Sequence, residues 1–86
     1  MPDVFGKVKA VIVEVIGDSR RNITPETRLL DDLDFDDLDF IDVCVDLEEQ
    51  FFMDVTDAEM ESWRTVQDIM NTCIRLDNNR VHTNKK

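Results

Sequence analysis

The segment "DDLDFIDVCVDLEEQFF" at residues 36–52 carries the strongest structural signal in the chain. Within it, apolar side chains recur at steps of three and four residues, the spacing that aligns side chains along one face of an α-helix. These side chains are Phe40, Cys44, Leu47 and Phe51. We therefore predict a helix that begins after Asp36 and turns this stripe toward a core.

The aspartates in front of the stripe mark the start of this predicted helix. Asp36 is suited to be its N-cap, because a carboxylate accepts hydrogen bonds from the free N–H groups of the first turn. Asp37 and Asp39 would lie in that first turn, where the positive end of the helix dipole favours negative charge. The acidic cluster is thus interpreted first as a helix start.

A calcium-binding loop is the competing interpretation of the same aspartates. Asp32, Asp34 and Asp36 match the first three ligand positions of an EF-hand. The match then fails, because Asp37 stands where a glycine is needed for the sharp turn and Val43 stands where a glutamate should close the shell. No metal site is expected.

The rest of the chain predicts three further helices around this one. Residues 4–16 show the apolar periodicity of a helix, and Gly17 is placed to end it. The segments "TDAE" at 56–59 and "TVQD" at 65–68 are typical capping boxes, the first opening a short helix and the second a longer one. We predict an all-α fold, a four-helix bundle with three longer helices and a short third helix.

One small core and one domain, residues 1–77, are expected from 86 residues of which 42% are hydrophobic. The long connection after the first helix should fold Ile23, Leu29, Leu30 and Leu33 against the core. Residues 78–86 are polar and are expected to form a flexible tail in which His82 is solvated. The predicted core residues are Phe5, Val8, Ile12, Phe40, Cys44, Leu47, Phe51, Val66, Ile69 and Ile74.

Charge is distributed unevenly along the chain. The formal net charge is −10, and residues 29–63 hold fourteen of the twenty acids with no Lys or Arg. Such a surface repels nucleic acids and anionic lipids and attracts basic protein surfaces. A solvated acidic surface that only maintains solubility is the alternative. We expect a monomer with positively charged partners and no bound nucleic acid.

The expected location is the cytoplasm, without membrane insertion. The most apolar stretch, residues 10–16, is too short for a bilayer and is interrupted by Glu14, and no secretory leader is recognised. Cys44 and Cys73 are too few for a disulfide framework and fall in apolar helical stretches, so buried and reduced thiols are expected.

A second apolar stripe distinguishes the helix that follows Asp36. Leu38, Ile41 and Val45 are spaced i, i+3 and i+7 and are rotated away from the first stripe. With the acids beside them they would form an acid-edged apolar strip that docks on basic partner surfaces. The alternative is that neighbouring helices bury both stripes, with Val45 in the core. We term the following residues the docking face: Asp36, Leu38, Asp39, Ile41, Asp42, Val45, Glu48 and Glu49.

Catalytic chemistry is not indicated by the sequence. There is no His near an acid or thiol, no Gly-rich phosphate loop and no spaced set of Cys and His. Carboxylates are abundant, but general acids need a concave apolar pocket that the pattern does not predict. We do not expect an enzyme.

Residues 4–76 resemble the acyl carrier proteins. The resemblance rests on "LLDDLDFDDLDFIDVCVDLEEQF" followed by "TVQDI", where the family has a D-S-L motif at the start of the second helix of a four-helix bundle, then an L-E-E-x-F. It implies a phosphopantetheine arm on the serine, which carries thioester-bound acyl groups among enzymes of fatty acid, polyketide or related lipid synthesis. The implied partners are basic surfaces of acyl-transferring and synthase enzymes and the phosphopantetheinyl transferase.

The attachment position departs from this family pattern, because the motif here is Asp36-Asp37-Leu38. A carboxylate does not replace the serine hydroxyl that forms the phosphodiester, so no covalent phosphopantetheine is expected on this chain. Two explanations stay open: a carrier whose serine was deliberately replaced, which the retained docking face favours, or a natural carrier-like protein that now acts only through interactions. Trp63 stands where the family commonly has a smaller aliphatic residue, and we expect it to fill the core or to line a cavity for an acyl chain.

Overall fold

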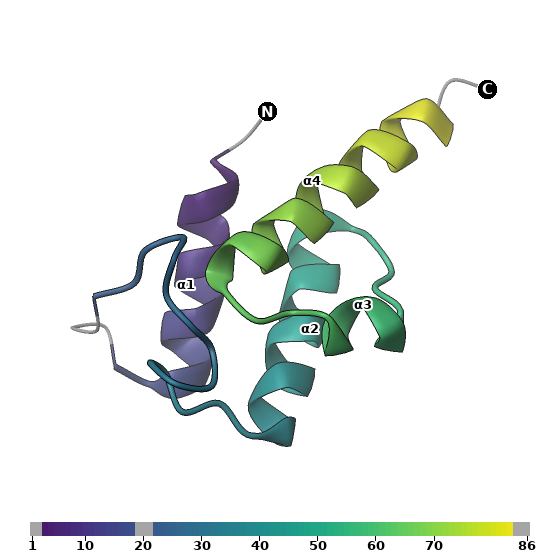
Figure 1. Cartoon of the computed structure of the whole chain (residues 1–86). Coiled ribbons are helices and arrows are strands. Elements are labelled where there is room, and N and C mark those ends of the chain that lie inside the picture. Colours follow the sequence, from purple (N-terminus) through teal and green to yellow (C-terminus); the bar gives the residue numbers. More distant parts are fainter. Residues whose placement is uncertain (1–2, 19–21, 84–86) are drawn as a thin grey trace.

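Four helices form the fold of the computed structural model, which describes residues 3–18 and 22–83 and the side chains among them up to residue 77. No strand occurs in these segments, so the all-α prediction of three longer helices and a short third one is confirmed. Helices α1 and α2 run in opposite directions side by side, and α4 packs across both (Figure 1). The helices are α1 (Val4–Ile16), α2 (Asp37–Phe51), α3 (Asp57–Glu61) and α4 (Val66–Thr83).

The helix ends follow the local signals in the sequence. Gly17 ends α1 in the left-handed conformation, with φ of 73°, and its N–H donates to the Val13 carbonyl oxygen. At the start of α3, the Thr56 side chain accepts from the Glu59 N–H while the Glu59 carboxylate accepts from the Thr56 N–H. This reciprocal capping box satisfies two N–H groups that a helix start otherwise leaves without partners.

The long connection between α1 and α2 is tied to the start of α4. The Leu29 N–H donates to the Arg64 carbonyl oxygen over 2.9 Å, and the Val66 N–H donates to the Thr27 carbonyl oxygen over 3.0 Å. These two hydrogen bonds pair Arg28 with Thr65 in an isolated antiparallel bridge. The bridge holds the connection against the turn that joins α3 to α4, although the two segments are distant in sequence. The start of α2 is thereby placed next to that turn.

The core corrects several of the predicted burial assignments. Phe5 and Phe40 only pack against its edge, Ile74 is exposed on α4, and Leu30 points into solvent from the connection. The reason on α4 is geometric, because turning Ile69 and Cys73 inward rotates the next residue outward. The core consists of Val4, Val8, Val11, Ile12, Ile23, Leu29, Leu33, Phe35, Val43, Cys44, Leu47, Phe51, Trp63, Val66, Ile69 and Cys73.

The C-terminal helix is longer than its apolar pattern predicted. The polar sequence after Leu76 led us to expect the helix to fray there, but α4 continues to Thr83. The division into a domain at residues 1–77 and a flexible tail at 78–86 stays a prediction. The expected solvation of His82 concerns a side chain outside the described residues.

Candidate functional site

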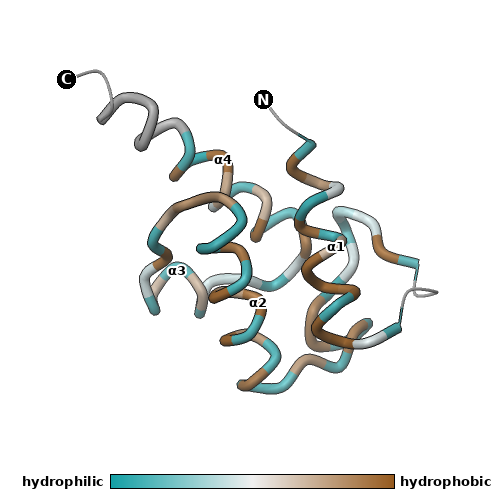
Figure 2. The backbone as a smooth tube through the Cα atoms, turned by 180° about the vertical axis from the view of Figure 1, so that it is seen from behind, coloured by the Kyte–Doolittle hydropathy of each residue, from teal (hydrophilic) through white to brown (hydrophobic). Residues whose placement is uncertain are grey.

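The second apolar stripe of α2 lies on the surface. Leu38 is 68% exposed and Ile41 and Val45 are each 46% exposed, so the alternative that placed Val45 in the core is wrong. Figure 2 shows hydrophobic and hydrophilic positions alternating along α2. The inward positions are filled instead by Val43, Cys44, Leu47 and Phe51. One helix thus carries a buried apolar face and an exposed one.

Asp36 and Asp39 of the docking face are held by hydrogen bonds that start α2. The Asp36 carboxylate accepts from the Asp39 N–H over 2.9 Å, and the Asp39 carboxylate accepts from the Asp36 N–H over 3.0 Å. Asp36 is therefore the N-cap that the sequence predicted, and Asp39 completes a capping box that the sequence analysis missed. The spacing of an acid three residues after the cap was the available signal.

Glu48 is also held by the fold. Its carboxylate accepts the Val55 N–H over 2.7 Å, which fastens the connection between α2 and α3. This contact spans seven residues and depends on the path of the connection, so no local pattern predicts it. Glu48 consequently has a structural role whether or not a partner binds.

Asp42 and Glu49 are the docking-face carboxylates that stay open to a partner. Both are exposed, and neither forms a hydrogen bond or ion pair with the part of the chain that the structure describes. They lie about two turns apart along the same side of α2, beside the exposed stripe of Ile41 and Val45. Their negative charge is available to attract a basic surface.

Asp37 occupies the first position of α2 and is exposed. It stands at the edge of a groove of about 470 Å³ between the start of α2 and the turn after α3. Apolar side chains dominate the lining, while Asp37 and Glu61 contribute negative charges and Arg64 contributes a positive one. The lining residues are Leu30, Asp37, Phe40, Ile41, Met60, Glu61, Trp63 and Arg64.

Trp63 closes the inner side of this groove. Its side chain is 1% exposed, and its indole N–H donates to the Thr72 hydroxyl over 2.9 Å. The Thr72 hydroxyl lies 3.3 Å from the Asp68 carbonyl oxygen and donates to it, so the buried polar groups are satisfied. Trp63 therefore fills the core and also lines the groove, so it has both of the roles that the sequence offered as alternatives.

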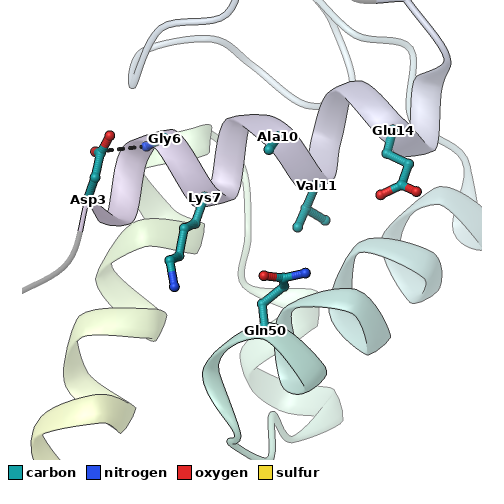
Figure 3. A pocket seen from close by; sticks show the side chains of 7 residues that line it. All are labelled: Asp3, Gly6, Lys7, Ala10, Val11, Glu14 and Gln50. Carbon is teal, nitrogen blue, oxygen red and sulfur yellow. Dashed lines mark hydrogen bonds between the residues drawn. The ribbon is translucent and has the colours of Figure 1, made fainter.

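A second hollow, of about 390 Å³, lies between α1 and α2 and is drawn in Figure 3. Its lining is of mixed polarity, with Lys7 and Glu14 from α1 and Gln50 from α2. Gly6 is required there by the N-cap, because a Cβ at this position would overlap the Asp3 carboxylate that accepts the Gly6 N–H. Helix capping explains Asp3 and Gly6, and the hollow does not include Asp37.

The thiols and acids offer no second site within the described residues. Both cysteines are free and buried. Burial raises the pKa of the Cys44 thiol to about 11, with nearby carboxylates adding to the effect, and burial raises the pKa of the Cys73 thiol to about 12, so neither is a reactive thiolate. In residues 3–18 and 22–83 no three His, Cys, Asp or Glu side chains gather in a way that could hold a metal ion.

No helix of the described segments combines the length and the apolar character that crossing a bilayer requires.

Comparisons with known proteins agree on one family. The family model described as "Phosphopantetheine attachment site" matches residues 6–73. The acyl carrier protein of Thermotoga maritima is 41% identical over 69 residues, which cover 80% of this chain and 85% of the relative. The acyl carrier protein of Helicobacter hepaticus is 38% identical over 68 residues, covering 79% and 90%.

A solved structure supports the same assignment at the level of the fold. It is that of a Mycobacterium tuberculosis protein assigned as an acyl carrier protein, with a TM-score of 0.75 and 26% sequence identity. The superposition covers 84% of this chain and 95% of that one.

Proposed function

The chain belongs to the phosphopantetheine-attachment family of acyl carrier proteins, and we propose that it is a carrier whose attachment position, Asp37, is not loadable. The family consists of carriers and not of enzymes, and phosphopantetheine is its cofactor. The acyl groups served would be intermediates of fatty acid, polyketide or related lipid synthesis.

The position of Asp37 carries this proposal. The residue is exposed at the first position of α2, between the docking face and the apolar groove, where an attached arm would reach both solvent and partner. Loading requires a hydroxyl oxygen that becomes a phosphodiester oxygen. A carboxylate oxygen would instead form a mixed anhydride with phosphate, which water cleaves, so no stable arm results.

Ser62 does not replace the missing hydroxyl. It lies at the end of α3, and its Oγ donates to the Glu59 carbonyl oxygen over 2.7 Å, where it caps the helix. The other serine, Ser19, lies outside the described residues and far in sequence from the start of α2. The proposed loss of loading therefore rests on residue 37 alone.

The proposed partners are acyl-transferring and synthase enzymes and the phosphopantetheinyl transferase, which would meet the docking face with basic surfaces. The exposed stripe and the open carboxylates of Asp42 and Glu49 support this assignment. A net charge of −10 favours a monomer, and two free buried thiols fit the cytoplasm.

A naturally non-loadable interaction protein is the second candidate, because it would need the same docking face without the arm. In that case the protein would regulate carrier-dependent enzymes by occupying them. The same exposed stripe supports both candidates, so loading of a serine variant is what separates them.

The test is intact mass after incubation with coenzyme A and a broad phosphopantetheinyl transferase. We expect the Asp37→Ser variant to gain the mass of the arm and the unaltered chain to gain nothing. If neither gains it, the surface recognised by the transferase has diverged and the interaction protein becomes the better account. A mass gain on the unaltered chain would overturn the proposal of a blocked position.

A further inference from the structure

Three methionines lie in the described part of the chain, and all three pack, partly buried, against the edge of the core. They are Met53 in the connection after α2, Met60 in α3 and Met70 in α4. Met60 lines the groove beside Asp37, whereas Met70 lines neither this groove nor the hollow between α1 and α2. A small solute in the groove therefore meets the Met60 side chain.

The cysteines are the other sulfur groups, and the fold protects them. Cys44 and Cys73 are both buried. Their thiols stay protonated at neutral pH, whereas the thiolate is the form that reacts with oxidants. A methionine thioether has no proton to lose, so only access limits its oxidation. Met60 is thus a more accessible target for an oxidant than either cysteine.

Met60 also fastens α3 to the rest of the molecule. This helix has no fully buried residue, and Met60 is its apolar side chain that packs against the core. The Glu59 carboxylate, 2.7 Å from Arg75 Nη2, ties the helix to α4. The Met60 carbonyl oxygen accepts the Trp63 N–H over 3.2 Å. The attachment of α3 therefore depends on the apolar character of one side chain.

We propose that Met60 is a reversible oxidation site, and that its sulfoxide releases α3 from the core. Hydrogen peroxide is the oxidant: one of its oxygen atoms bonds to the thioether sulfur, the O–O bond breaks, and the other oxygen leaves as water. The sulfur loses two electrons and the peroxide gains them. Two thiols reverse the step through a methionine sulfoxide reductase, giving the thioether, a disulfide and water.

The structural effect follows from the polarity of the sulfoxide. Its oxygen needs a hydrogen-bond partner, and the core edge beneath α3 is apolar, so the oxidised side chain is more stable in water. Trp63 lines the same groove and is only 1% exposed, so its indole would gain exposure as Met60 moves outward. The inference concerns how α3 is attached and does not depend on loading at Asp37.

The test treats the full-length protein with hydrogen peroxide and locates the added oxygen by mass spectrometry of its peptides. We expect Met60 to be oxidised several times faster than Met70, and the emission of Trp63 to move to longer wavelengths at the same rate. Amide hydrogen exchange at Met60 and Trp63 should become several times faster. Methionine sulfoxide reductase should reverse all of these changes, which distinguishes them from oxidation of the indole.

Two leucine variants show which sulfur is responsible. Met60→Leu keeps the apolar volume, and peroxide should leave its Trp63 emission and its amide exchange unchanged. Met53→Leu is the matched control and should respond like the unaltered chain. If Met60→Leu responds as strongly as the unaltered chain, Met60 is not the switch and the proposal is wrong. Oxidation of Met60 that leaves the emission and the exchange unchanged would overturn the release of α3.

Discussion

The two faces of α2 carry similar side chains in opposite environments, one buried and one exposed. Leu47 and Val43 are fully buried against the other helices, whereas Leu38 and Val45, of the same types and on the same helix, remain in water. Burial of apolar area stabilises a fold by about 25 cal/mol per Å², so the inward stripe contributes to folding and the outward stripe contributes little. We therefore propose that the outward stripe serves association with another protein.

The carboxylates of α2 show the same division. Asp39 and Glu48 accept backbone N–H groups and stabilise the two ends of the helix. Asp42 and Glu49 are exposed and make no such contact with the described residues. Tests of docking should therefore alter the second pair, because changing the first pair would also disturb the fold.

The largest expected effect is on stability, and it tests the comparison between the two stripes directly. Leu47→Ala should lower the free energy of unfolding by about 2–5 kcal/mol, because it leaves a cavity in the core. Leu38→Ala should change it by less than about 0.5 kcal/mol, because the side chain is already in water. Urea unfolding followed by fluorescence of Trp63, the only tryptophan, measures both. Equal losses in the two variants would contradict the assignment of the faces.

An intermediate effect is expected where the groove meets the core. Thr72→Val removes the acceptor of the buried Trp63 indole N–H, so it should lower the free energy of unfolding by about 1–3 kcal/mol. Adding Trp63→Phe removes the stranded donor, and Thr72→Val should then cost much less in that background. Since this variant has no Trp, the comparison is made by thermal unfolding followed by circular dichroism. Additive losses would show that the hydrogen bond does not couple the two residues.

The smallest expected effect concerns the carboxylates and pH. The pKa of Glu59 is lowered, chiefly by its hydrogen bond from the Thr56 N–H and further by Arg75, whose Nη2 is 2.7 Å from its carboxylate. Because the folded pKa lies below the unfolded one, this stabilisation is present above the usual value of 4.5 and is lost as the pH falls through the lowered pKa.

Glu59→Gln should therefore cost up to about 1 kcal/mol at pH 7 and less at low pH. Glu49→Gln is the matched control, since that exposed carboxylate makes no hydrogen bond or ion pair with the described residues, and it should change the free energy of unfolding much less at pH 7. Urea titrations at pH 7 and pH 3.5 measure the difference. If Glu59→Gln lowers the free energy of unfolding as much at pH 3.5 as at pH 7, the stabilisation does not come from the ionised carboxylate.

The sequence predicts most of the fold because capping and periodicity are local. Asp36, Gly17 and Thr56 mark helix ends correctly, and the outward stripe follows from spacing alone. Ile74 was wrongly placed in the core, and Phe40 packs only against its edge. Helical spacing fixes which side chains share a face and not how far the neighbouring helices extend over that face. Glu48 was assigned only to docking because its bond to the Val55 N–H depends on the tertiary path of the chain.

The exposed end of α2 could have been suspected from the sequence. The adjacent pair Phe51 and Phe52 cannot both turn inward at the end of one helix, because successive residues differ by about 100° in direction. The left-handed backbone of Phe52 was not predictable, since it arises from how the chain leaves the helix.

Competition for the transferase tests the central claim most directly. The Asp37→Ser variant is loaded at a fixed concentration while the unaltered chain is added in increasing amounts, with its Asp42→Lys variant as control. The account predicts that the unaltered chain slows loading by occupying the enzyme, whereas the control slows it several times less and with a weaker dependence on salt. Loading that proceeds at the same rate with or without the unaltered chain would contradict a docking face that persists without its arm.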